Sequence, residues 1–191
     1  MKTRHLIAFI LAAGVLAACS SSPSGTTGTS DSATGSAAQS STLDVSWAEH
    51  YSTVADLKKH SDVAVQGKVV KLVSETVDAK GVPSRRYQFA VSATILDPKH
   101  RLTGSAPTLT LTQTGGLVSG TTVQVSDDPL YRVGEELVLF LKEGTPGLYH
   151  VVGGPNGRYS VTDGKVKPFS NETAAATAGT TSAFAAEVKT S

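Results

Sequence analysis

The stretch "VAVQGKVVKLVSETV", residues 63–77, decides the fold. Most of its valines fall on alternate positions: Val63, Val65, Val69, Val73 and Val77. Alternate side chains of a strand point to the same face, so this pattern predicts a half-buried strand. The run is long for one strand, and Gly67 lies inside it. We therefore expect a β-bulge at Gly67 that bends the strand.

A second run of the same kind follows directly. In "RRYQFAVSATIL", residues 85–96, the apolar side chains again alternate: Tyr87, Phe89, Val91, Ala93 and Ile95. The turn residues "DAKGVPS", residues 78–84, separate the two runs. The sequence therefore predicts a long antiparallel hairpin.

Further short strands follow the hairpin. "TLTLTQT", residues 108–114, places Leu109 and Leu111 inward, and the unbroken apolar run Leu137–Leu141 predicts a central strand buried on both faces. Two turns, Pro155-Asn156-Gly157 and Asp163-Gly164, separate the last strands. Because open sheet edges are a hazard, so many strands indicate a closed barrel or two packed sheets.

One helix is expected before the strands. Trp47, Tyr51, Val54 and Leu57 share a helix face by their spacing. Two pairs, Ser46 with Glu49 and Thr53 with Asp56, have the spacing of a capping box. One long helix or two short pieces would fit. The two aromatic residues are expected to pack on the sheet, and the alternative is a ligand platform.

The N-terminus reads as an export signal. Basic Lys2 and Arg4 precede the apolar run of residues 6–18, which is too short to span a bilayer. Leu16-Ala17-Ala18-Cys19 resembles the lipobox of bacterial lipoproteins. That resemblance implies a signal peptide at residues 1–18, a lipid on Cys19 and a place on the extracytoplasmic face of the bacterial cell membrane. The alternative is a buried or reactive thiol near an ordinary cleavage site.

Composition divides the rest of the chain. Residues 19–42 hold the cysteine and a Ser/Thr/Gly-rich linker, which we expect to be flexible. Residues 43–169 form the predicted β domain. Residues 170–191 are a low-complexity tail, in which Phe184 and Val188 have the spacing of one short helix. Without Lys2 and Arg4 the chain has 15 basic and 16 acidic residues, so nothing suggests binding to nucleic acid.

The order of the strand patterns carries a second resemblance. The stretches "ADLKKHSDVAVQGKVVKL", "VSATIL", "LTLTQTGG", "VGEELVLFL" and "YHVVGGPNGRYSV" resemble a group of uncharacterised bacterial envelope lipoproteins. Their order is also similar to the OB-type barrel of netrin and metalloprotease-inhibitor modules. It implies a mainly β fold, a small antiparallel OB-like barrel or sandwich with a short N-terminal helix. Those inhibitors use a disulfide-clamped N-terminal cysteine, which this chain lacks, so inhibition by that route is not implied.

No motif for catalysis is found in the sequence. The patterns of serine hydrolases and zinc peptidases are absent, and His50, His60, His100 and His150 are scattered. The acidic pairs Asp127-Asp128 and Glu135-Glu136 are interpreted as solvated turn ends. We therefore expect no enzymatic activity, no cofactor and no metal site.

Two glycine-rich stretches offer a candidate binding surface. Glycines let a partner approach the backbone closely, which favours this set of residues: Gln113, Thr114, Gly115, Gly116, Asn156 and Gly157. The expected function is a lipid-anchored binding or assembly module whose partner is an envelope protein or a wall glycan. The alternatives are an envelope hydrolase with an unfamiliar site and a lipid carrier.

Overall fold

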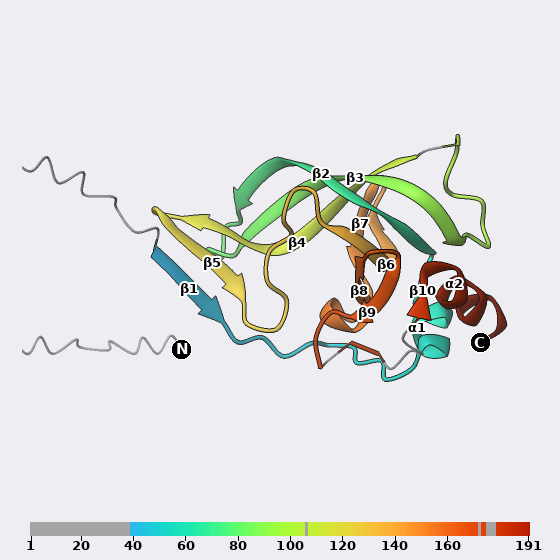
Figure 1. The fold of residues 1–191 in the computed structure, drawn as a ribbon. Helices are drawn as coiled ribbons and strands as arrows, with labels where there is room; N and C mark the ends of the chain where they lie inside the picture. The colour runs from blue at the N-terminus through green and yellow to red at the C-terminus, as the bar shows by residue number, and fades with distance from the viewer. Residues whose placement is uncertain (1–38, 106, 172, 175–178) are drawn as a thin grey trace, which may run out of the picture. The chain divides into compact units, whose positions relative to one another are not determined.

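The structure is a computed structural model that describes residues 39–105, 107–171, 173–174 and 179–191 (Figure 1). The predicted signal peptide, Cys19 and most of the predicted linker lie outside the described residues. The described residues form one compact unit.

The described chain is mainly strand. The strands are β1 (Gln39–Leu43), β2 (Val63–Val77), β3 (Pro83–Leu96), β4 (Thr108–Val118), β5 (Thr121–Val125), β6 (Glu136–Thr145), β7 (Leu148–Val151), β8 (Arg158–Thr162), β9 (Lys165–Pro168) and β10 (Gly179–Thr180). The helices are α1 (Val54–His60), a single 3₁₀ turn η1 (Gly154–Gly157) and α2 (Thr181–Thr190).

Five strands close on themselves. The sheet runs β1-β5-β4-β3-β2-β6-β8-β9-β10, and β7 pairs with both β4 and β6. Strands β2, β3, β4, β7 and β6 therefore form a ring, the OB-like barrel that was expected. The sheet is mixed, because β1 pairs with β5 and β7 with β4 in parallel. The mainly β class and the short N-terminal helix are confirmed.

Strand β6 divides the core into two clusters. Leu137, Leu139 and Leu141 belong to the cluster inside the barrel, together with Val65, Phe89 and Leu111. Val138 and Phe140 point the other way, into a cluster that the two helices cover with Leu57, Phe184 and Val188. All five residues from Leu137 to Leu141 are fully buried. The prediction of a central strand buried on both faces is confirmed.

The β2–β3 hairpin forms as predicted, with a register shift beside Gly67. A Cβ on Gly67 would lie 2.2 Å from the Ala90 carbonyl oxygen, so only glycine allows this close approach of the two strands. The burial pattern differs from the prediction in the second half of β2. Val63, Val65 and Val69 are buried, but Val73 and Val77 are exposed because none of the described elements covers this part of the hairpin.

The helix before the sheet is short. Thr53 caps α1, since its hydroxyl accepts a hydrogen bond from the Asp56 backbone N–H. The other predicted capping pair, Ser46 with Glu49, belongs to a segment that is not helical, so Trp47 and Tyr51 precede α1. Neither one long helix nor two short helices forms. Neither Trp47 nor Tyr51 lies in a helix, so contacts with other parts of the chain hold both side chains in place.

The last turns are close to their predictions. Asp163 and Gly164 have φ of 51° and 70°, as a type I′ turn requires. The predicted β-turn at Pro155-Asn156-Gly157 is the 3₁₀ turn η1, which follows Gly153 in the left-handed region.

The folded unit extends past both predicted domain boundaries. β1 begins at Gln39, within the predicted linker, and pairs with β5. At the other end, α2 lies in the predicted tail and buries Phe184 and Val188 completely. The Phe184 ring centroid lies 4.8 Å from that of Tyr159 and 6.3 Å from that of Phe140. The C-terminal segment is therefore part of the core, because small residues around one Phe and one Val are enough to dock a short helix.

Candidate functional site

A cavity lies at the seam of the barrel. β4 and β7 run parallel and pair at only two positions, Thr110 with Leu148 and Leu111 with Tyr149. The residues that follow in each strand line a cavity of about 240 Å³. Its lining comes from six segments: Trp47, Ser84, Thr112, Gln113, Thr114, Asp128, Tyr131, His150, Val151 and Gly154. The hollow therefore exists because two strands of the ring separate after a short contact.

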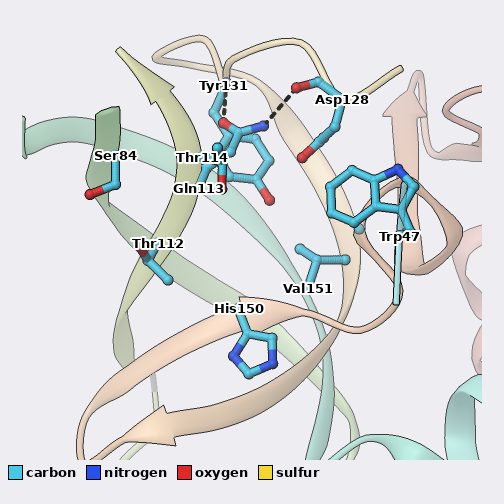
Figure 2. A pocket seen from close by; sticks show the side chains of 10 residues that line it. Trp47, Ser84, Thr112, Gln113, Thr114, Asp128, Tyr131, His150 and Val151 are labelled. Atoms are coloured by element: carbon cyan, nitrogen blue, oxygen red, sulfur yellow. Dashed lines mark hydrogen bonds between the residues drawn. The ribbon is translucent and has the colours of Figure 1, made fainter. Parts of the chain in front are cut away.

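Figure 2 shows how these side chains are arranged. Ser84 and Thr112 lie on one side of the cavity and Trp47 on the other, with Val151 and His150 at its lower edge. Two hydroxyl-bearing residues and an aromatic residue thus lie on opposite sides of the opening.

Trp47 is fixed on both its edge and its face. Its indole N–H donates a hydrogen bond to Asp127 Oδ2 at 2.7 Å. Its ring packs so closely on Gly154 that a Cβ there would lie 2.4 Å from a ring carbon. Gly154 also has φ of 57°, which favours glycine. The ring is therefore held in place before any ligand arrives.

The buried side chain of Gln113 holds the loop between β5 and β6 through hydrogen bonds. Its amide nitrogen donates to the carbonyl oxygens of Asp128 and Pro129, at 3.2 and 3.1 Å. Its amide oxygen accepts from the Tyr131 backbone N–H at 3.0 Å. These bonds, two of them dashed in Figure 2, position Asp128 and Tyr131 at the cavity. The bonds show that Gln113 orders the wall of the site.

Arg158 supports the same wall from behind. It is almost fully buried, and its guanidinium lies 4.4 Å from the Tyr131 ring centroid and 3.6 Å from that of Phe169. Its Nη1 donates to Asp128 Oδ1 at 2.8 Å, and its Nη2 lies 3.1 Å from Glu135 Oε1. A buried charge needs such partners, so this network fixes both Asp128 and Tyr131.

Burial shifts the titration of the cavity groups. It raises the pKa of the Tyr131 hydroxyl well above its ordinary value, so this hydroxyl stays protonated. It also raises the pKa of Asp128, and the guanidinium of Arg158 opposes that rise. Asp128 was predicted to be a solvated turn end, and this is wrong: it is buried and paired.

The predicted surface residues are divided by the structure. Gln113 and Thr114 line the cavity. Gly115 and Gly116 are buried, and a Cβ on Gly115 would lie 2.8 Å from Leu130. Asn156 and Gly157 are buried too, and Asn156 Oδ1 accepts from the Tyr51 backbone N–H at 2.9 Å. Those four residues pack the fold and do not form an exposed binding surface; Gly154 of the same stretch reaches the cavity instead.

Sequence patterns did not indicate the other residues that line the cavity. Ser84, Thr112, Tyr131 and His150 belong to different strands or loops and form no motif in sequence. Trp47 was noted, with a ligand platform as the alternative to packing. Its place at the cavity follows from contacts with Asp127 and Gly154, which are distant in sequence.

Comparisons with known proteins add no family to this chain. No protein-family model matches it, and no curated protein matches it significantly. Within the described residues, no helix is long and apolar enough to cross a membrane.

Proposed function

We propose that this protein is a lipid-anchored binding module of the bacterial cell envelope, and that the seam cavity takes one sugar ring of a wall glycan. The lipobox-like Leu16-Ala17-Ala18-Cys19 supports a lipid on Cys19 and a place on the extracytoplasmic face of the membrane. The observation that carries the binding role is the cavity where β4 and β7 separate, with a fixed Trp47 opposite two hydroxyl side chains.

The lining favours a neutral, hydroxyl-rich ligand. Ser84, Thr112, Thr114 and the Tyr131 hydroxyl can each donate or accept a hydrogen bond, and Trp47 offers an apolar surface. Pockets for drug-sized ligands measure about 300–1,000 Å³, so a cavity of about 240 Å³ suits a smaller group. One sugar ring of a longer chain meets both conditions.

The same side chains support binding over hydrolysis. A hydrolytic site needs a carboxylate or imidazole that is free to accept a proton from water or a nucleophile. Asp128, the cavity's carboxylate, already accepts a hydrogen bond from Arg158. Its role here is to hold the wall of the cavity. The cavity's imidazole is that of His150, and among the described residues no serine, threonine or carboxylate hydrogen-bonds it to form a nucleophile–base pair.

Co-sedimentation with insoluble wall glycan tests the proposal. The chain is expected to pellet with the glycan, and Thr112→Phe, which fills the cavity, should weaken that binding about tenfold or more. Thr110→Phe is the matched control, because Thr110 lies on the same strand with similar exposure but outside the cavity. Absence of binding by the unaltered chain, or equal loss in both variants, would contradict a glycan site at the seam.

The anchor is tested separately. Cys19→Ala should abolish incorporation of labelled fatty acid and release the protein from the membrane fraction, since no other cysteine is present. Continued labelling of this variant would refute the proposed anchor without affecting the glycan site.

A further inference from the structure

The outer part of the β2–β3 hairpin is apolar yet uncovered. Val73 and Val77 of β2 are 52% and 49% exposed, Val82 in the turn is 43% exposed, and Leu117 of β4 is 49% exposed. Six of the nine large apolar side chains that are exposed in the described chain lie here. We define them as the hairpin patch: Val70, Leu72, Val73, Val77, Val82 and Leu117. Single exposed apolar residues are ordinary, but a group of this kind indicates contact with a partner.

Glu75 joins the two hairpins that form the patch. Its Oε1 accepts a hydrogen bond from Arg85 Nε at 2.5 Å and another from the Leu117 backbone N–H at 3.0 Å. A Cβ on Gly116 would lie 3.5 Å from Pro83. The end of β4 therefore lies against the outer part of the β2–β3 hairpin, and Leu117 lies close to the paired residues Val77 and Pro83.

The hairpin is also basic. Five basic and two acidic side chains lie between Lys68 and Arg86. The rest of the chain has 12 basic and 14 acidic residues, so positive charge is concentrated on this segment. Of the two acids, Glu75 pairs with Arg85, and Asp78 accepts hydrogen bonds from two backbone N–H groups of the turn. With Arg85 and Glu75 set against each other, Lys68, Lys71, Lys80 and Arg86 outnumber Asp78, and the formal net charge of +3 suits an anionic partner.

The chain enters the described domain at this same end. Gln39 of β1 pairs with Thr121 of β5, next to the β4–β5 turn, and Leu117 pairs with Thr122. Figure 1 shows the start of β1, the β4–β5 turn and the β2–β3 turn at one end, and α1 and α2 at the other. Cys19 lies 20 positions before Gln39. A lipid on Cys19 would therefore tether the domain to the membrane from the end that carries the patch.

We propose that the hairpin patch docks on an anionic phospholipid bilayer and forms a second membrane contact. The apolar side chains enter the boundary between headgroups and acyl chains, and Lys80 of the turn contacts lipid phosphates. Lys71 and Arg86 lie on the face opposite to Leu72 and Val77 and contact phosphates from the other side of the hairpin. The inference that this end of the domain faces the membrane rests on the proposed acylation of Cys19. The apolar and basic character of the patch does not depend on it. With this contact the domain lies against the membrane surface, with β2–β3 toward it.

A second copy of the chain fits the patch less well. The outer part of β2 is interrupted by register shifts around Val70 and Val73. Such bulges disrupt the regular row of backbone groups that edge-to-edge pairing of two strands requires.

Vesicle sedimentation tests the proposal without the lipid anchor. The chain from Ser20 to Ser191, which contains every described residue of the compact unit, is mixed with vesicles of phosphatidylglycerol and phosphatidylcholine. It is expected to bind these and to bind pure phosphatidylcholine at least tenfold more weakly. Binding should also fall in 1 M salt, where the screening length is only about 3 Å.

The variant Val77→Asp/Val82→Asp locates the contact. It should reduce binding to the anionic vesicles about tenfold or more, because both side chains are exposed and the changes add negative charge. Val133→Asp is the matched control: Val133 is 64% exposed but lies in the loop between β5 and β6, and its change should leave binding within twofold. Circular dichroism should be the same for all three proteins.

Three results would overturn the proposal. The first is failure of the unaltered chain to bind anionic vesicles. The second is equal binding by the double variant and the Val133 control. The third is binding to soluble poly(glycerol phosphate) as tight as to vesicles, since this would show an anion site without insertion. None of these results bears on the seam cavity, which the Thr112 variant tests separately.

Discussion

Strand β6 and the outer half of β2 belong to one sheet and are similarly apolar, yet their surroundings are opposite. Residues Leu137–Leu141 of β6 are fully buried, with the barrel on one face and the helices on the other. Val70, Leu72, Val73 and Val77 of β2 are all exposed. An apolar strand is buried only where other elements of the fold pack against it. None of the described elements packs against the outer half of β2.

Removing α2, which packs against the outer face of β6, should have the largest effect on stability. A chain that ends at Phe169 lacks Phe184 and Val188, which are fully buried against the outer face of the sheet. Loss of one buried Phe alone costs about 3–5 kcal/mol, and a whole domain is stable by only about 5–15 kcal/mol. We expect the shortened chain to be largely unfolded by near-ultraviolet circular dichroism. A cooperative transition like that of the longer chain would show that α2 is dispensable.

Phe140→Ala tests how much the packing of β6 contributes to stability. The side chain is fully buried beside Tyr159 and Phe184, and its loss leaves a cavity between them. The free energy of unfolding should fall by about 3–5 kcal/mol, measured by urea denaturation. A fall below 1 kcal/mol would mean that the outer cluster is loosely packed.

Gly67→Ala tests the close approach of β2 and β3 within the buried half of β2. The added Cβ would meet the Ala90 carbonyl oxygen at 2.2 Å and the Phe89 ring at 2.6 Å, so the strands must separate. Overpacking of this kind costs about 1–3 kcal/mol. An unchanged free energy of unfolding would show that the bulge can shift without strain.

Val77→Ser should have the smallest effect on stability. Because Val77 is half exposed and touches no core cluster, the free energy of unfolding should change by no more than about 0.5 kcal/mol. The same urea titration measures it beside Phe140→Ala. A fall above 1.5 kcal/mol would indicate that the hairpin is covered in solution, and the contrast with β6 would then disappear.

The sequence predicts the strands well because their signals are local. The positions of the strands, the register shift beside Gly67 and the Asp163-Gly164 turn each depend on near neighbours, and these appear as expected. The covering of each strand is not local. Val73 continues the pattern of Val69 without a break, but the core ends between them.

The site was harder to predict for the same reason. Gln113 and Thr114 were selected because glycines follow them, and they do line the cavity. The cavity depends on the separation of β4 from β7, two strands that are distant in the chain. Asp128 reads as a turn residue until Arg158, 30 positions later, is seen to bind it.

The central claim is that the seam cavity binds a sugar ring, and the intrinsic fluorescence of Trp47 tests it most directly. Trp47 is the single tryptophan of the chain and lines the cavity, so its emission reports on that site alone. Titration with soluble wall-glycan fragments should produce a saturable change in emission that Thr112→Phe abolishes and Thr110→Phe preserves. A chain that binds wall glycan while its emission stays constant, or that responds equally in both variants, would contradict the claim.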